Sequence, residues 1–195
     1  MTPYQALLLE LAIASESAAI ELWWQAEELG DDVLAAALAA ILATYTGRAA
    51  ALAVTAWSAQ ASVAVGEVVP AALIALPDSD IDRLAKAATT VVQVAKKSPA
   101  PESIVGRIAR AEPLKTASDT YHEQLTTSGL VEGWTRGMDP DPCDLCGFWW
   151  REGRVWPKAH PFQRHLGCAC VPIPVWRKEI QSTMYTRRLE RNRSA

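Results

Sequence analysis

The sequence predicts a mainly α-helical protein, in which an alanine-rich helical amino-terminal region precedes a small Cys/His-rich β-hairpin module of the zinc-knuckle type. Apolar residues recur every three or four positions along most of the first part, which is the spacing of amphipathic helices. All four cysteines and two of the three histidines lie in the second part. Within the 195 residues we expect a helical domain at 1–129 with a linker at 97–102, a Cys/His-rich module at 130–176 and a basic tail at 177–195.

The helical region is expected to form four main helices, over residues 3–29, 33–65, 81–96 and 102–128. Thr2 and Pro3 are typical of a helix start, and Gly30 is typical of a helix end. The second helix is rich in alanine, and Arg48 interrupts its apolar run. We therefore interpret it as a helix packed on the first one and not as a membrane span, and we expect no membrane contact.

The second part is expected to form short strands with few apolar contacts between them. Residues 130–136 should be extended, and Gly153 should turn a hairpin between Phe148–Arg151 and Arg154–Trp156. Residues 170–176 alternate apolar positions and contain two prolines, which favours a strand at a sheet edge. A metal ion and several tryptophans would supply the stability that so small a core lacks.

The cysteines and histidines have the spacing of metal ligands. Cys143 and Cys146 form a C-x-x-C pair in which Gly147 suits a tight turn, and the same two-residue spacer separates His165 from Cys168. Zinc prefers thiolate sulfur and imidazole nitrogen in a tetrahedral arrangement. We therefore predict a closed, structural zinc site with the ligands Cys143, Cys146, His165 and Cys168.

Two further side chains are alternate ligands. Cys170 can replace Cys168, but on a strand both would point to one face, with their sulfur atoms too far apart for one ion unless the backbone bends. His160 is the substitute for His165. Other interpretations of the cysteines are free buried thiols or two disulfides, and the latter are typical of secreted proteins. The residues after Met1 lack the basic and apolar regions of a signal peptide, so disulfides are not favoured.

The segment 133–172 resembles a known module. It combines a C-x-x-C pair, a short spacer expected to be a hairpin, and an H-x-x-C-x-C pattern followed by a proline, at Cys143, Cys146, His165, Cys168, Cys170 and Pro172. This order is similar to the carboxy-terminal module of Mu F-like proteins, in the form found in phages of actinobacteria. Mu F-like proteins are head morphogenesis or minor capsid proteins of tailed bacteriophages.

The resemblance implies a protein that is encoded near the portal and made during head assembly. It would be present in few copies in the procapsid or virion, after assembly in the host cytoplasm. The implied partners are the portal, scaffold or major capsid protein. Relatives in this group are often labelled capsid maturation proteases, so cleavage of scaffold or capsid protein is the alternative function.

The residues themselves give thin support for catalysis. The sequence has no glycine-rich phosphate loop. Cys143 or Cys170 could pair with a nearby histidine as nucleophile and base. Ser128, His122 and Asp119 could form a triad, although no nucleophile elbow is visible and His122 is otherwise expected to be an ordinary surface residue. A metal-dependent nuclease is a further alternative. Because none of these arrangements is well supported by the residues, we expect a non-enzymatic assembly protein.

The charges are unevenly distributed along the chain, whose net charge of −3 by itself indicates no partner. Residues 1–47 contain seven acids and no lysine or arginine, whereas residues 177–195 contain six basic residues and two acids. The tail is therefore a candidate to contact packaged DNA or an acidic protein surface. The candidate contact residues are Arg187, Arg188, Arg191 and Arg193.

Overall fold

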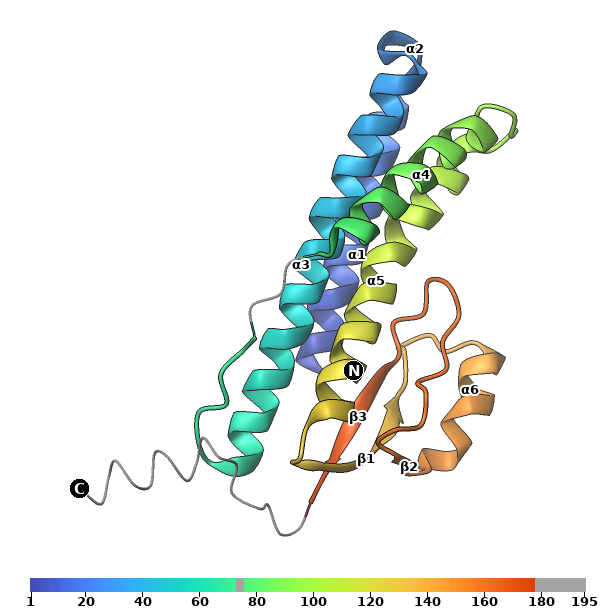
Figure 1. Cartoon of the computed structure of the whole chain (residues 1–195). Helices are drawn as coiled ribbons and strands as arrows, with labels where there is room; N and C mark the ends of the chain where they lie inside the picture. The colour runs from blue at the N-terminus through green and yellow to red at the C-terminus, as the bar shows by residue number, and fades with distance from the viewer. Residues whose placement is uncertain (73–75, 178–195) are drawn as a thin grey trace, which may run out of the picture.

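The structure is a computed structural model of the chain, and it describes residues 1–72 and 76–177. Long helices run side by side, and a small sheet packs against one end of them (Figure 1). The helices are α1 (Pro3–Trp23), α2 (Ala26–Leu29), α3 (Asp31–Val65), α4 (Asp78–Ala95), α5 (Pro101–Thr127) and α6 (Asp144–Trp150). A 3-10 turn and three strands complete the fold, namely Arg151–Gly153, β1 (Val131–Gly137), β2 (Trp156–Pro157) and β3 (Val171–Trp176). The predicted fold class, mainly α with a small Cys/His-bearing β module, is confirmed.

The first predicted helix begins as expected but ends early. The Thr2 side chain accepts a hydrogen bond from the Gln5 amide (3.2 Å), and the Gln5 side chain accepts one from the Thr2 amide (2.9 Å). A single helix over 3–29 is wrong, because the Gln25 amide bonds to the carbonyl three residues back and tightens the last turn. The short α2 follows, and Gly30, with a φ of 73°, leads the chain into α3.

The other three predicted helices are confirmed with ends within three residues of those expected. The 35-residue α3 is long and apolar enough to cross a membrane, a test that core helices of soluble proteins also pass. One side of α3 packs against α1, α4 and α5 and buries a stripe that includes Leu34, Leu38, Leu42, Val54 and Trp57. The expectation of no membrane contact stays a prediction.

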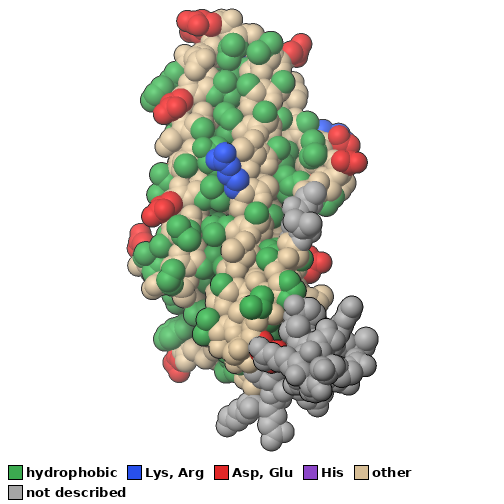
Figure 2. All heavy atoms as spheres, turned by 90° about the vertical axis from the view of Figure 1, so that its left-hand side faces the viewer, with side chains coloured by type: hydrophobic (Ala, Val, Ile, Leu, Met, Phe, Trp, Pro, Cys, Tyr) green, Lys and Arg blue, Asp and Glu red, His purple; other side chains and the backbone are tan. Residues whose placement is uncertain are grey.

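The outward side of α3 is poor in charge. Arg48 is the single lysine or arginine of this helix. Figure 2 shows this face of the molecule, on which hydrophobic and uncharged side chains predominate and acidic groups lie mostly near the edges.

The sheet is antiparallel, with the strand order β2–β1–β3. The edge position predicted for the last strand is confirmed. The predicted hairpin between 148–151 and 154–156 is wrong, because the first of these segments lies in α6 and the 3-10 turn, and Trp156 pairs with Trp134 of β1. Gly133 permits this close pairing, since a Cβ atom there would lie 2.3 Å from the Trp156 carbonyl oxygen.

The buried apolar residues form two main clusters. One lies among the helices and includes Leu34, Leu38, Leu42, Leu84, Val92 and Val105. The other is shared by the helices and the sheet and includes Tyr4, Leu8, Trp57, Tyr121, Leu125, Val131, Trp134 and Val171. A domain boundary at residue 129 stays a prediction, but the sheet packs on the helices through this shared core.

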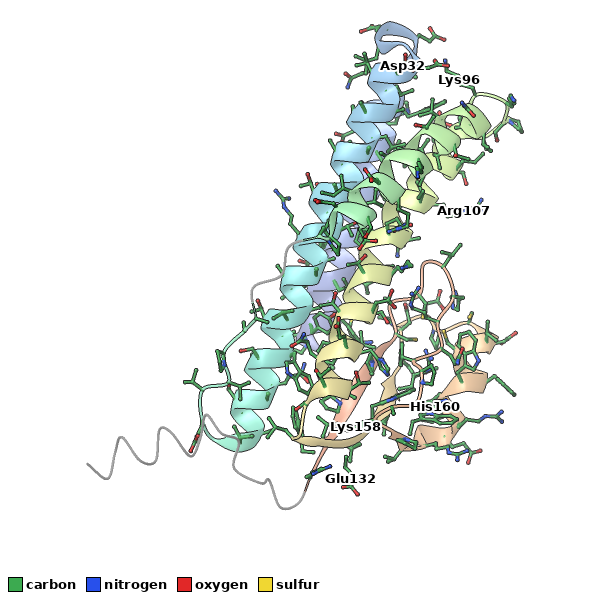
Figure 3. All side chains as sticks on the ribbon, in the orientation of Figure 1. Asp32, Lys96, Arg107, Glu132, Lys158 and His160 are labelled. Carbon is green, nitrogen blue, oxygen red and sulfur yellow. The ribbon has the colours of Figure 1, made fainter. Side chains whose placement is uncertain are left out.

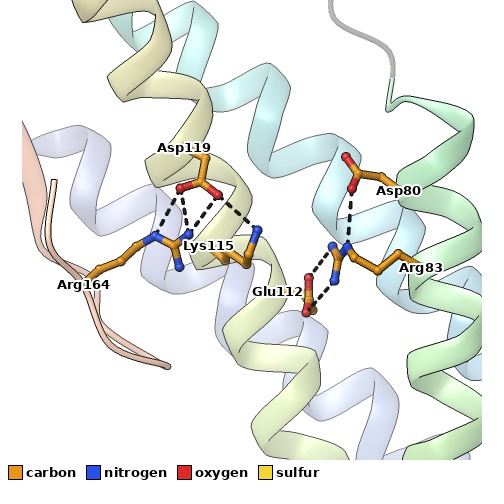
Figure 4. A network of polar contacts seen from close by, with 6 residues as sticks. All are labelled: Asp80, Arg83, Glu112, Lys115, Asp119 and Arg164. Carbon is orange, nitrogen blue, oxygen red and sulfur yellow. Dashed lines mark hydrogen bonds and ion pairs between the residues drawn. The ribbon is translucent and has the colours of Figure 1, made fainter. Parts of the chain in front are cut away.

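Ion pairs join neighbouring elements around this core (Figure 4). Arg83 of α4 donates two hydrogen bonds to Glu112 of α5, at 3.0 and 2.8 Å. Arg164, in the loop before β3, donates from Nη2 to both carboxylate oxygens of Asp119 on α5, at 2.7 and 2.9 Å. Partly exposed ion pairs contribute little stability individually. These two pairs join α4 and the loop before β3 to α5.

Candidate metal centre

Cys143 and Cys146 lie at the first turn of α6. Cys143 immediately precedes the helix, and its carbonyl accepts a hydrogen bond from the Gly147 amide (3.0 Å). This turn brings the two thiols to the same side of α6. The expectation that Gly147 provides a special turn is wrong, because it lies within the helix and has no positive φ.

His165 and Cys168 lie on a turn in the loop before β3. The Cys168 amide donates a hydrogen bond to the His165 carbonyl (3.3 Å). Gly167 has a φ of 78°, a conformation that residues with side chains rarely adopt. Gly167 is therefore the glycine on which the geometry of this turn depends.

The two turns bring the donor atoms into contact. His165 Nε2 lies 3.1 Å from Cys143 Sγ and 3.2 Å from Cys146 Sγ. The Sγ atoms of Cys146 and Cys168 are 3.4 Å apart. Ligand atoms around one tetrahedral zinc ion lie about 3.5–3.8 Å apart, so these three close pairs have nearly the spacing that a zinc ion requires. Cys168 would have to move closer to Cys143 and His165 to share one ion with both, because no group of donors within 4.8 Å contains all three. The groups that can hold a metal ion comprise Cys143, Cys146, His165, Cys168 and Cys170.

These donors form two overlapping groups of three that share Cys146. One group adds Cys143 and His165, the other adds Cys168 and Cys170, and the donor atoms of each group lie within 4.8 Å of one another. The sulfur atoms of Cys168 and Cys170 would lie too far apart on a strand unless the backbone bends, and the backbone does bend here. The strand begins only at residue 171, and the preceding bend brings the Cys170 amide to 3.4 Å from Cys168 Sγ. Which four of the five donors bind an ion stays a prediction.

The tautomer of His165 is fixed by the backbone. Its Nδ1 lies 3.0 Å from the Leu166 carbonyl oxygen. Because a carbonyl oxygen only accepts hydrogen bonds, Nδ1 carries the proton, and the lone pair of neutral imidazole is left on Nε2. That lone pair faces the thiols of Cys143 and Cys146, and a backbone carbonyl bonded to the other ring nitrogen is the usual support of a metal-binding histidine.

The buried thiols differ in acidity. Burial raises the pKa of Cys146 to about 12, and the pKa of Cys168 is raised because its thiol donates a hydrogen bond to Cys170 and is buried. The pKa of Cys170 is lowered to about 5 by hydrogen bonds from Cys168 and from the Asp139 amide. The protein alone thus favours a single buried thiolate, whereas a metal ion would bind further thiolates and release their protons.

A buried arginine lies beside the thiols. Arg136 of β1 is 3% exposed, and its guanidinium lies over the rings of Phe162 (4.3 Å) and Trp149 (5.3 Å) and donates to the Gln163 carbonyl. Among the residues that the structure describes, no carboxylate pairs with Arg136, and its Nε and Nη1 have no hydrogen-bond partner. A buried cation requires a compensating anion. The Cys170 thiolate, whose pKa is lowered in part by Arg136, supplies this anion, and the further thiolates of a metal cluster would add to it, so the surroundings suit a metal ion.

Two side chains outside the donor set hold the loops in place. Asp139 Oδ2 accepts a hydrogen bond from the Ala169 amide (2.9 Å), and the Asp139 amide donates to Cys170 Sγ (3.2 Å). Gln5 of α1 is 1% exposed. Its Nε2 donates, at 3.3, 3.0 and 3.3 Å, to the carbonyl oxygen atoms of Gly137, Met138 and Ala169.

Sequence reasoning missed these supporting residues. Asp139 had a detectable signal, because an Asp-Pro-Asp-Pro run is typical of a turn in which the first carboxylate accepts a following amide, here that of Asp141 (3.1 Å). Gln5 and Arg136 had no such signal in the sequence around them. The partners of Gln5 lie 132 to 164 positions away, so no local pattern contains them.

The remaining histidines lie away from the donors. His160, the alternate ligand, is labelled in Figure 3. Its ring stacks on that of Trp156 with 4.3 Å between centroids. Its carbonyl accepts hydrogen bonds from Trp134 Nε1 (3.2 Å) and His122 Nε2 (3.0 Å). The expectation that His122 is an ordinary surface residue is wrong, because it is half-buried in this aromatic cluster and burial lowers its pKa.

A pocket of about 200 Å³ opens beside the donors, and its lining includes Arg110, Asp139, Asp141, Cys143 and His165. The candidate tail contacts Arg187, Arg188, Arg191 and Arg193 lie outside the described residues. Comparisons of the chain with protein-family models, with curated proteins and with solved structures each find no match.

Proposed function

We propose that this protein is a non-enzymatic phage head assembly protein whose carboxy-terminal module is built around a structural zinc ion. The convergence of three thiols and the His165 Nε2 lone pair on the fourth thiol, Cys146, is the observation that carries the proposal. Zinc suits this donor set, because it favours thiolate and imidazole ligands in a tetrahedron. The proposed ligands are Cys143, Cys146, His165 and Cys168, with Cys170 as the alternate.

A structural role is supported by the number of donors and by what they connect. If one ion takes four of the five donors, no coordination site is left open for a substrate. The donors come from α6 and from the loop before β3, which share no strand pairing. Zinc would therefore lower the conformational entropy of the module and preform a surface for docking.

The head-assembly part of the proposal rests on the resemblance of residues 133–172 to Mu F-like modules. The residues that carry this resemblance are also the donors that lie together in the fold. The proposed partners are the portal, scaffold or major capsid protein. The proposed place of action is the procapsid, which assembles in the host cytoplasm.

The second candidate function is a capsid maturation protease. It is favoured by the exposed Cys143 thiol, which lies 3.1 Å from His165 Nε2 beside the 200 Å³ pocket. Against it, Cys146 Sγ lies equally close to the same nitrogen, and a nucleophile–base pair gives this buried thiol no role. Ser128, considered for a serine triad, accepts a hydrogen bond from the Leu130 amide instead (3.1 Å).

Native mass spectrometry of the full chain, purified without chelator, tests both candidates. The chain is measured alone and then with the scaffold and portal proteins encoded in the same genome. We expect one zinc ion per chain, a complex with one of these proteins, and no cleavage products. A metal-free chain would overturn the zinc centre, and the absence of any complex would overturn the assembly role.

The His165→Ala variant separates the candidates further. For a structural site, we expect loss of zinc and of the order of the module. If the variant stays folded and wild-type protein cuts the scaffold while the variant does not, the protein is a protease. Tail-dependent DNA binding, which should weaken steeply with salt and vanish without residues 177–195, would support a nucleic-acid-binding role instead.

A further inference from the structure

The end of the helical bundle far from the sheet carries a pocket that the metal centre does not explain. The pocket has a volume of about 450 Å³ and lies between α2, the end of α4 and the start of α5. Its lining includes Trp23, Trp24, Glu27, Lys96 and Glu102. Trp24 is 69% exposed, so its indole is accessible to a ligand in the pocket.

The side chains that line this pocket are suited to bind a planar cation such as a guanidinium group. Indole faces attract guanidinium and ammonium groups, and the attraction strengthens when a carboxylate pairs with the same group. In the part of the chain that the structure describes, Glu27 and Glu102 form no ion pair, whereas Lys96 is paired with Asp31. The pocket therefore offers two aromatic side chains and two free carboxylates to a ligand.

The end of the bundle around the pocket is acidic on balance. The exposed Glu28, Asp31 and Asp32 add to the pocket acids Glu27 and Glu102, against the two cations Lys96 and Lys97, and Asp32 and Lys96 mark this end in Figure 3. Residues 1–47 contain no lysine or arginine, so no cation of α1, α2 or the first half of α3 offsets these acids. A basic polypeptide segment would be attracted to this end of the molecule.

The chain itself contains a segment of matching charge. Residues 177–195 carry six basic residues against two acids, and Arg187, Arg188, Arg191 and Arg193 fall within seven positions. This segment follows Trp176, whose ring lies 5.5 Å from that of Trp57. Along α3, the rise from Asp31 to Trp57 is about 39 Å, so the segment starts far from the pocket of its own molecule.

For Arg187 and Arg188, reach favours the pocket of a partner molecule over that of the same molecule. Fully extended, the residues from Trp176 to Arg187 span about 38 Å. Arg187 and Arg188 would meet the pocket of their own chain only at the limit of extension. A second copy can present the same arginines without this constraint.

We propose that the pocket formed by Trp23, Trp24, Glu27 and Glu102 binds the side chain of Arg187 or Arg188 from a second copy of the protein. The contact joins the acidic end of one molecule to the basic segment of the next. Such a head-to-tail contact is heterologous, so it generates a ring if the rotation closes and a linear assembly if it does not. The proposal does not depend on the zinc centre or on phage partners.

Charge reversal in the full chain tests this contact. One variant combines Glu27→Lys with Glu102→Lys, and a second combines Arg187→Glu with Arg188→Glu. A control combines Glu10→Lys with Glu132→Lys, which changes the same number of charges at exposed acids outside the pocket. Sedimentation velocity over a range of concentrations, at low and high salt, gives the mass of each species, and circular dichroism checks that every variant is folded.

We expect the wild type and the control to self-associate at low salt, and each reversal variant to associate at least tenfold more weakly. Mixing the two reversal variants should restore association. The pocket variant keeps the basic tail, the tail variant keeps the acidic pocket, and these two unchanged parts can then bind each other. A wild type that is monomeric at every concentration overturns the proposal. Self-association that the pocket variant leaves unchanged, or a tail that binds only DNA, also overturns it.

Discussion

Gln5 and Ala169 are joined by a buried hydrogen bond that spans 164 positions of the chain, with 3.3 Å between Gln5 Nε2 and the Ala169 carbonyl oxygen. Ala169 lies between the two cysteines of the C-x-C pair. The first turn of α1 is thereby attached directly to the candidate metal centre. Gln5 also closes the capping box of α1 with Thr2, so one side chain fixes both the start of the helix and the loop that carries the thiols.

Replacing Gln5 with alanine should lower the free energy of unfolding by about 1–3 kcal/mol, because the buried carbonyls of Gly137 and Ala169 lose their donor. Urea denaturation measures the change. The matched control is Gln25→Ala, since Gln25 is exposed and its side chain donates to the Glu21 carbonyl of the preceding helix α1. The control should change stability by less than about 0.5 kcal/mol. Equal effects of the two substitutions would contradict a special role for Gln5.

Replacing Gly133 with alanine should disrupt the pairing of β1 with β2. The added Cβ would lie 2.3 Å from the Trp156 carbonyl oxygen, so one strand has to move, at a cost of about 1–3 kcal/mol. Thermal unfolding gives the stability, and tryptophan fluorescence reports on Trp134 and Trp156. Gly129→Ala is the control, because nothing lies within 4 Å of its Cβ position and its φ is not positive. An unchanged melting temperature for the Gly133 variant would contradict the close approach of the strands.

Replacing Arg136 with methionine should weaken metal binding about 10- to 100-fold, the usual effect of losing a residue that supports the ligands. Methionine keeps much of the apolar contact with Phe162 but removes the buried cation beside the thiols. Zinc affinity is measured by competition with a chromophoric chelator. Arg107→Met, which removes an exposed arginine of α5, should leave the affinity unchanged. A loss of stability with unaltered zinc affinity would assign Arg136 a packing role alone.

Removal of the metal by a chelator should loosen the loop that carries the thiols more than the helices. Hydrogen exchange should become faster in α6 and in residues 163–170, where few backbone hydrogen bonds fix the chain, and should change little in α3 and α5. Mass spectrometry of peptides follows both regions in one experiment. Re-addition of zinc should restore protection in wild type and fail to do so in Cys146→Ser. Identical exchange with and without chelator would contradict a structural metal.

The titration of His122 should make the protein less stable as pH falls. Burial lowers the pKa of His122 below its ordinary value of 6.5, against the opposing effects of its hydrogen bond to the His160 carbonyl and of Asp119. Below pH 6.5 the unfolded state therefore binds more protons than the folded state, which favours unfolding. Stability should be fully present above pH 7 and decline through the window below 6.5.

The His122→Gln variant isolates this contribution, since glutamine keeps an N–H donor for the His160 carbonyl. Urea denaturation of both proteins between pH 5 and 8 gives the comparison. Relative to the variant, wild type should lose stability towards the acid end of the range. Parallel pH profiles would show that His122 has an ordinary pKa in the folded protein.

The metal donors illustrate how much local sequence can determine. The C-x-x-C and H-x-x-C spacings place each pair on one turn, whatever the rest of the fold does, so the donors could be predicted from the sequence. The spacing did not reveal the bend between Cys168 and Cys170 or the distance of His160 from the donors. Both depend on where β3 begins and on the aromatic contacts of Trp134 and Trp156.

The sequence by itself determined the start of α1 and the long helices α3, α4 and α5, because their apolar periodicity, caps and terminal glycines act within a few residues. It did not determine that residues 144–150 are helical, since Trp156 finds its strand partner in β1 and not in the residues just before it. The supports of the metal centre, Gln5 and Arg136, were likewise decided only by tertiary structure. Their contacts join residues brought together by the shared core, and such contacts leave no pattern along the chain.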